Sequence, residues 1–104
     1  MDLLEIINRI SSLRIRANLS ARELSLRIDK NGAYITRLES KKDSFEPSVS
    51  ALLAIIDACN STPAEFFYYD IAQYKTDLNV ITKLKKLDSN KKRLVNDLID
   101  TLTS

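Results

Sequence analysis

Residues 19–39 read LSARELSLRIDKNGAYITRLE, and this stretch decides how the rest of the chain is interpreted. It contains two short helical patterns separated by three or four polar residues. Apolar side chains recur at helical spacing in each pattern, at Leu24 and Ile28 in the first and at Ile35 and Leu38 in the second. The stretch therefore predicts two short helices joined by a tight turn, with these four side chains in the core.

The composition of the whole chain favours helices. A length of 104 residues suits one domain with a small helical appendage, and 44% hydrophobic residues are enough for a core. One glycine and two prolines leave few places for tight β-turns, and no segment alternates apolar and polar residues for the length of a strand. We expect an all-α fold.

Several classes of function are disfavoured by what the sequence lacks. The single cysteine rules out an internal disulfide, and there is no signal peptide or long apolar span, so we expect a cytoplasmic protein without membrane contact. No histidine is present, which removes the usual zinc sites and the common nucleophile–base pairs. We expect no enzyme, no metal or other cofactor, and no evident small-molecule ligand.

Capping patterns mark the helix boundaries. A capping residue followed by glutamate three positions later occurs at Asp2, Ser20 and Thr62. Asn18 and Asn60 suit the left-handed residue that ends a helix. The expected helices run over about 3–17, 20–28, 31–40 (capped by Asn31) and 48–59, followed by a short helix after Thr62 that carries Phe66 and Phe67 into the core.

The C-terminal part is predicted to be a helical hairpin. Apolar residues recur at helical spacing from Tyr74 to Leu87, and again from Leu94 to Leu102, where Asp88 is placed to cap the second arm. We therefore divide the chain into residues 1–69, with five helices, and residues 70–104, a hairpin that dimerises or caps the core.

The basic residues are unevenly distributed. The segment 9–42 holds nine lysine and arginine residues and three acidic residues, a net charge of +6, although the whole chain carries only +2. Such asymmetry is typical of proteins with a polyanionic partner. A solvated helical surface is the alternative interpretation.

The ordered set of residues resembles a known family. The similarity covers about residues 8–67, five helices by the family's pattern, and is to the Xre-type helix-turn-helix domain of Cro and phage repressors. The matching positions are Ile10, Leu13, Arg14, Leu19, Ser20, Glu23, Leu24, Ile28, Tyr34, Ile35, Arg37, Leu38, Glu39, Pro47, Ser48, Leu52, Leu53 and the run 62–67.

The resemblance implies roles for individual residues. The second helix of the pair would lie in the major groove of double-stranded DNA, where each base pair displays a distinct code. A pair between Arg14 and Glu39 would tie the first helix to the third. The implied base-facing residues are Gly32, Ala33, Thr36 and Arg37. The implied phosphate contacts are Ser20, Ala21, Arg22, Lys30, Asn31, Tyr34, Lys41 and Lys42.

Several of these residues have a structural alternative. Arg37 would either contact bases or be a solvated surface residue. Lys41 and Lys42 would complement the negative end of the preceding helix even without DNA. Tyr34 would either pack on the first helix of the pair or bind a phosphate.

The resemblance implies a sequence-specific regulator of transcription, a repressor that binds as a homodimer to two half-sites. Gly32 and Ala33 offer no side-chain hydrogen bond to bases, which keeps a second hypothesis open. In that hypothesis the same fold is a protein-interaction module, resembling an antitoxin or an antirepressor partner, with weak or lost DNA binding.

Overall fold

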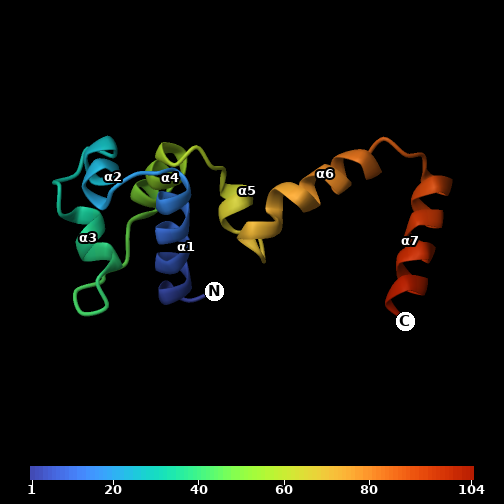
Figure 1. The fold of residues 1–104 in the computed structure, drawn as a ribbon, viewed down its shortest axis with the longest axis horizontal. Helices are drawn as coiled ribbons and strands as arrows, with labels where there is room; N and C mark the ends of the chain where they lie inside the picture. Colours follow the sequence, from blue (N-terminus) through green and yellow to red (C-terminus); the bar gives the residue numbers. More distant parts are fainter. The chain divides into compact units, whose positions relative to one another are not determined.

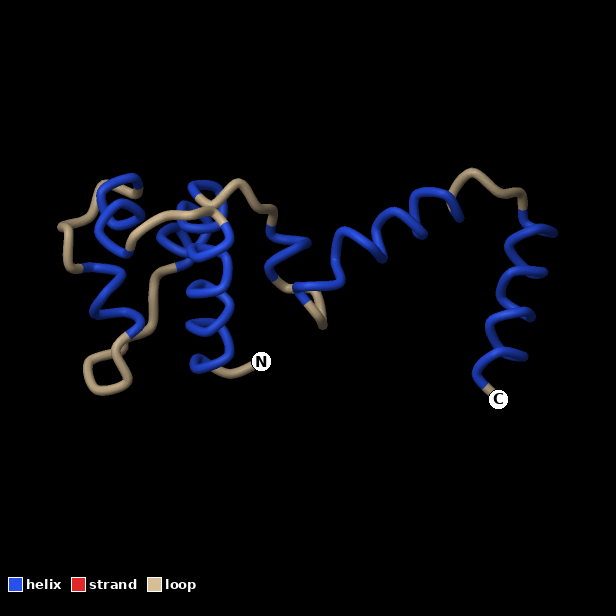
Figure 2. The backbone as a smooth tube through the Cα atoms, in the orientation of Figure 1, coloured by secondary structure: helices blue, strands red, loops and turns tan.

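The computed structural model describes residues 1–104, and all of its regular elements are helices (Figure 1). Figure 2 shows helices joined by loops and turns, without a strand, so the prediction of an all-α fold is confirmed. The helices are α1 (Leu3–Arg16), α2 (Ala21–Arg27), α3 (Tyr34–Glu39), α4 (Val49–Ala58), α5 (Pro63–Phe66), α6 (Tyr74–Leu84) and α7 (Ser89–Thr103), with a 3-10 turn at Ile71–Gln73.

The chain divides into two compact units, Met1–Ile71 and Ala72–Ser104. The first unit contains α1 to α5 and the buried core, and the second contains α6 and α7. None of the helices is both long enough and apolar enough to cross a lipid bilayer.

Side chains cap the first two helices as predicted. Asp2 Oδ1 accepts a hydrogen bond of 2.9 Å from Glu5 N at the start of α1. At the start of α2, Ser20 Oγ accepts from Glu23 N at 3.0 Å, and Ser20 N donates to Glu23 Oε1 at 3.2 Å. These bonds satisfy N–H groups that have no acceptor inside the helix, which is why both helices begin where the sequence indicates.

Three residues adopt left-handed backbone conformations at helix ends. Asn18 follows α1 with a φ of 57°, Asp29 follows α2 with a φ of 58°, and Asn60 follows α4 with a φ of 56°. Asparagine and aspartate tolerate this region better than other residues with a side chain. The chain can therefore reverse sharply between α2 and α3 without a glycine at that point.

The beginning of α3 differs from the prediction. We expected Asn31 to cap a helix over residues 31–40, but α3 begins at Tyr34, and its N-cap residue, Ala33, makes no side-chain capping bond. Asn31 Oδ1 instead accepts from Ala33 N at 3.0 Å, and Asn31 O accepts from Tyr34 N at 3.1 Å. The short polar side chain thus stabilises a turn that competes with the helix, and the N-cap position moves from Asn31 to Ala33.

The core lies between α1, α2, α3, α4 and the single turn of α5. Phe66 is fully buried there, as predicted, whereas Phe67 is 50% exposed. Successive residues of a helix point about 100° apart, so a four-residue helix can turn only one of the two rings inward. The buried apolar residues are Ile7, Ile10, Leu13, Leu19, Leu24, Ile35, Leu38, Ala51, Ile55, Ile56, Cys59 and Phe66.

Arg9 holds the chain that follows α5. Its side chain is buried, and Nη1 donates to Phe66 O at 2.7 Å and also to Tyr68 O. Arg9 Nη2 donates to Tyr69 O at 3.3 Å. One guanidinium group therefore satisfies three carbonyl groups, one at the end of α5 and two beyond it, a role that the sequence did not indicate.

The second unit has two helices and no buried residue in either of them. Asp88 caps α7 as predicted, with Oδ1 accepting from Lys91 N at 2.9 Å. The apolar side chains of α7 other than Val95 remain exposed, including Leu94, Leu98 and Leu102 at 69%, 57% and 75%.

Candidate nucleic-acid interface

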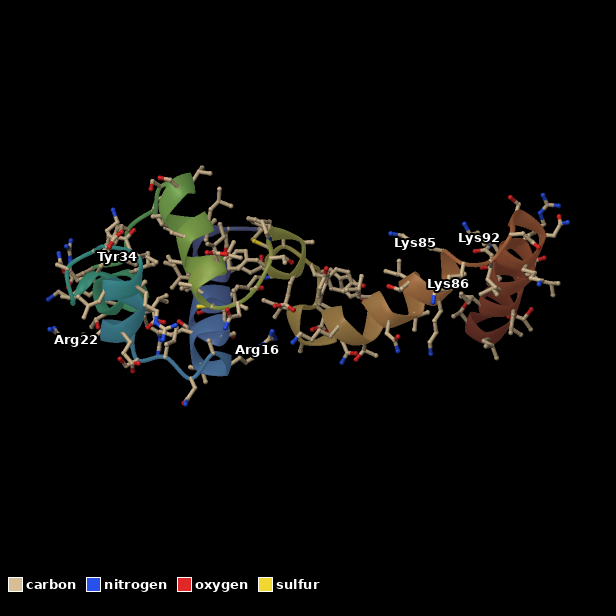
Figure 3. All side chains as sticks on the ribbon, turned by 90° about the horizontal axis from the view of Figure 1, so that it is seen from above. Arg16, Arg22, Tyr34, Lys85, Lys86 and Lys92 are labelled. Carbon is tan, nitrogen blue, oxygen red and sulfur yellow. The ribbon has the colours of Figure 1, made fainter.

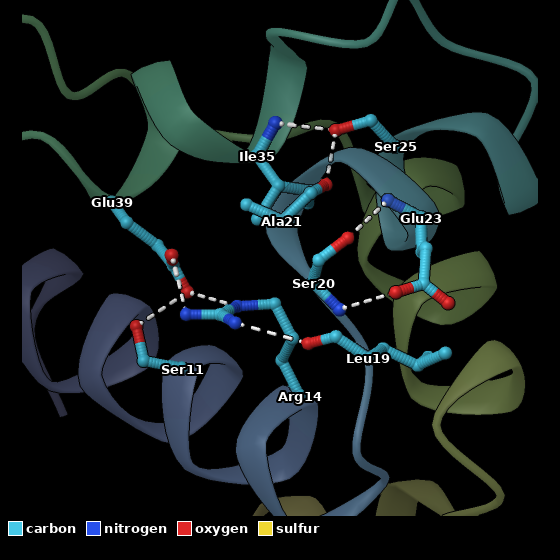
Figure 4. Close-up of polar contacts among 9 residues, drawn as sticks. All are labelled: Ser11, Arg14, Leu19, Ser20, Ala21, Glu23, Ser25, Ile35 and Glu39. Carbon is cyan, nitrogen blue, oxygen red and sulfur yellow. Dashed lines mark hydrogen bonds and ion pairs between the residues drawn. The ribbon is translucent and has the colours of Figure 1, made fainter.

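A buried hydroxyl group joins α2 to α3. Ser25 is fully buried, and its Oγ donates to Ala21 O at 2.7 Å (Figure 4). The same oxygen accepts from Ile35 N, in the first turn of α3, at 2.9 Å. Because α3 has no side-chain cap of its own, this bond from the neighbouring helix satisfies one of its free N–H groups. Ser25 thereby fixes the start of α3 against α2.

An ion pair connects α1 to the end of α3. Arg14 Nε lies 2.9 Å from Glu39 Oε1, and Arg14 Nη2 lies 3.1 Å from Oε2, in a two-pronged arrangement (Figure 4). Arg14 Nη1 also donates to Leu19 O at 3.0 Å, and Ser11 Oγ donates to Glu39 Oε1 at 2.7 Å. The guanidinium and the carboxylate are both half-buried, so they position α3 and add no charge to the surface.

Three of the four residues expected to face bases are exposed on α3 or just before it: Ala33, Thr36 and Arg37. Gly32 is only half-exposed because the Arg22 side chain lies over it. A Cβ atom added at Gly32 would overlap Arg22 Nη1 and come within 3.1 Å of Arg22 Cζ. The glycine therefore makes room for an arginine that crosses from α2 to the turn before α3.

Cations and rings alternate along the side of α3. Lys30 Nζ lies 5.4 Å from the centre of the Tyr34 ring, and the Tyr34 ring meets Phe45 edge to face at 5.2 Å. Arg37 Cζ lies 5.5 Å from the centre of the Phe45 ring. Both cation–ring distances fall within the range of attraction. Burial of the Tyr34 ring raises the pKa of its hydroxyl group above the ordinary value.

Phe45 belongs to this group, although it was not among the site residues that the sequence predicted. It comes from the polar loop after α3 and packs partly against the core, so it brings that loop back to Arg37. A signal was present in the sequence, since Phe45 is the one aromatic residue between Tyr34 and Phe66. Its partners could not be inferred, because the loop's path was unknown.

The start of α2 has fewer free donors than expected. The N–H groups of Ser20 and Glu23 are already used in the capping box, which leaves those of Ala21 and Arg22. Hydrogen bonds from Ser20, first from its backbone N–H and then from its hydroxyl group, lower the pKa of Glu23. The Glu23 carboxylate therefore stays ionised at this helix end, where a phosphate was expected.

The positive charge of segment 9–42 is only partly available to a partner. Arg14 is paired with Glu39, Arg16 Nη2 lies 3.5 Å from Glu65 Oε1, and Arg9 is buried. Figure 3 shows Arg22 and Tyr34 together near α2 and α3, with Arg16 well apart from them. Two acidic residues, at positions 43 and 46, follow the segment directly. The exposed cations without an ion pair are Arg22, Arg27, Lys30, Arg37, Lys41 and Lys42.

No three histidine, cysteine, aspartate or glutamate side chains lie close enough together to hold a metal ion. Cys59 is buried in the core, and this burial raises the pKa of its thiol above the ordinary value.

Comparison with known proteins agrees with the geometry of α2 and α3. A family model described as a helix-turn-helix matches residues 10–66, which is more than half of the chain. No curated protein and no solved structure matches the chain.

Proposed function

The chain belongs to the Xre-type helix-turn-helix family of DNA-binding regulators, and from this membership we propose that it is a sequence-specific transcriptional repressor acting as a homodimer. The observation that carries the proposal is the free guanidinium group of Arg37 on the exposed side of α3. The other side of α3 is fixed to the core by Ile35 and Leu38. A rigid helix with one open, cationic side suits insertion into the major groove.

Arg37 is the proposed centre of base recognition. Its guanidinium group lies over the Phe45 ring, with Cζ 5.5 Å from the ring centre, and it makes no hydrogen bond or ion pair within the chain. Its N–H groups therefore remain free for a two-pronged contact with guanine. Thr36 and the methyl group of Ala33 would lie beside thymine methyl groups, and DNA shape would supply further discrimination.

Phosphate contacts would come from cations around α3. Arg22 lies across the turn before α3, Lys30 lies on the Tyr34 ring, and Lys41 and Lys42 follow the helix. All four side chains are exposed and have no acidic partner. They would set affinity and register without reading sequence.

Dimerisation is proposed for the second unit together with α5. Isolated helices as short as α6 and α7 are marginal in water, and neither buries a side chain here. A second copy would cover the apolar side of α7, at Leu94, Leu98 and Leu102. Two copies would also provide the two recognition helices that a symmetric operator requires. Replacing Leu98 by glutamate should yield a monomer in sedimentation; a wild-type chain that is already monomeric at micromolar concentration would exclude the dimer.

In vitro selection from a random duplex pool tests the proposed function directly. The expected result is a palindromic site with half-sites about 34 Å apart. On this site, Arg37→Ala should relax preference at one or two base pairs by about 1–3 kcal/mol, whereas Lys41→Ala with Lys42→Ala should weaken binding to all duplexes. No enriched sequence, with the wild-type chain folded, would refute sequence-specific binding.

One observation favours a second function, a protein-interaction module of the same fold. Gly32 is covered by Arg22, and Ala33 has only a methyl group, so two of the four expected base-facing positions donate no side-chain hydrogen bond. A pull-down that returns one stoichiometric protein, with no salt-sensitive retention on DNA, would support this function instead.

A further inference from the structure

A second group of cations lies where α6 ends and α7 begins, and it was not singled out by sequence analysis. We call this group the junction cluster; Lys85, Lys86 and Lys92 are labelled in Figure 3. All of its side chains are exposed. Its members are Lys83, Lys85, Lys86, Lys91, Lys92 and Arg93.

The cluster is almost free of compensating charge. Within residues 83–93 the only acidic residue is Asp88, whose carboxylate caps α7 by accepting from Lys91 N at 2.9 Å. No member forms an ion pair, and Arg93 is unpaired even though Asp97 lies one turn further along α7. Six cations therefore meet one carboxylate, a net charge of +5 over eleven residues.

The position of these cations is unfavourable for α7 itself. The first turns of a helix carry partial positive charge, so acidic residues are favoured there and basic residues are not. The first turn of α7 holds no acidic residue, and Lys91, Lys92 and Arg93 follow one another near its start. Asp88 supplies one negative charge at this helix end, and an external anion would offset the repulsion that remains.

The distribution of charge along the chain links the cluster to the helix-turn-helix. Fifteen of the sixteen basic residues lie in segments 9–42 and 83–93, together with four of the fourteen acidic residues. Outside these segments there is one basic residue, Lys75, and ten acidic residues. The chain thus has two separate positive regions, and the first belongs to the helix-turn-helix.

From these observations we infer that the junction cluster is a second binding surface for the phosphate backbone of duplex DNA. The inference rests on the proposed function, which places the same polyanion beside the chain. Five of the six cations are lysines, which bind phosphate as point charges and lack the planar fork suited to guanine. The cluster would therefore add affinity and no sequence preference. On α7, Lys91 shares the face of Leu94 and Leu98, whereas Lys92 and Arg93 lie off it. A dimer formed through the leucines therefore leaves Lys92 and Arg93 accessible.

Glutamine variants of the full-length chain test the inference. One variant is Lys85→Gln with Lys86→Gln, beyond the end of α6, and the other is Lys91→Gln with Lys92→Gln and Arg93→Gln, within α7. Glutamine keeps side-chain length and a similar helix propensity while removing the charge. The matched control is Lys75→Gln, an exposed lysine of α6 outside the cluster. Binding is measured by fluorescence anisotropy over a salt series, on the selected operator and on a random-sequence duplex of equal length.

Each lost phosphate contact should lower the slope of log affinity against log salt by about 0.9 and weaken binding about 5- to 10-fold at 0.1 M salt. The loss should be equal on both duplexes, and the Lys75 variant should match the wild type. Junction variants whose slope equals that of the Lys75 variant would overturn the inference. If the wild-type chain shows no sequence preference but the junction variants still lose slope on duplex DNA, the proposed function fails and the inference stands. The substitutions of the Lys85→Gln with Lys86→Gln variant lie outside both helices. This variant therefore still tests the inference if the α7 variant fails to fold.

Discussion

Replacing Ser25 by alanine should destabilise the pairing of α2 with α3 while leaving the exposed surface unchanged. The substitution removes the acceptor for Ile35 N, a backbone group in the buried interior. A buried donor left without a partner costs about 1–3 kcal/mol. The Ala21 carbonyl keeps the backbone bond of its helix, so it adds no further cost. A loss of 1 kcal/mol should lower the Tm by about 4–8 °C for a domain of this size.

The control for this prediction is Ser12→Ala. Ser12 is exposed on α1, so the exchange gives the same gain in helix propensity without loss of a buried bond. Urea denaturation followed by circular dichroism at 222 nm, with the thermal midpoint, measures both variants. If Ser25→Ala is as stable as Ser12→Ala, the hydroxyl group does not support α3 and the reasoning is wrong.

Three further predictions follow from contacts in the first unit. Arg14→Ala should reduce the free energy of unfolding by about 2–4 kcal/mol, because it leaves the half-buried Glu39 carboxylate without its cation. Adding Glu39→Ala should restore part of this loss in urea denaturation. If the losses of the two single variants simply add in the double variant, the two residues are not coupled. Gly32→Ala should leave the free energy of unfolding within about 1 kcal/mol of the wild type but weaken DNA binding, because the added methyl group displaces Arg22. In an Arg22→Ala background, Gly32→Ala should cause no further loss of DNA affinity. A loss of affinity that persists in that background would show that Arg22 is not its cause. Cys59 should react slowly with a thiol reagent in the folded chain and rapidly in urea, because burial raises the pKa of the thiol and keeps the reagent away from it. Equal reaction rates in the two conditions would show that the core opens readily.

The sequence predicted those helix boundaries that depend on local side-chain-to-backbone bonds. Asp2 and Ser20 cap their own helices, and Asn18 ends α1 through its own backbone conformation. The predicted start of α3 was wrong for two reasons. The Asn31 side chain makes a local bond that stabilises a turn instead of a cap, and the N–H group of Ile35 is satisfied by a residue of α2 that is distant in the sequence.

In the candidate site, too, the features that depend on local spacing were predicted and those that depend on distant contacts were not. The exposure of Thr36 and Arg37 followed from helical periodicity, since they alternate with the buried Ile35 and Leu38. The Phe45 support for Arg37 depends on how a loop returns to its helix, and no spacing rule describes that. Charge counting could not separate free cations from internally paired ones, because pairing partners lie far apart along the chain.

The way Arg9 binds the end of the first unit has an evolutionary consequence. Its guanidinium group holds this segment through three main-chain oxygens, so substitutions at Tyr68 and Tyr69 can accumulate without loss of that attachment. Whatever polypeptide follows Ile71 can then be lengthened, exchanged or recombined while the folded body before it stays intact. A regulator built on this plan can acquire a new assembly or a new effector segment without redesigning the part that meets DNA.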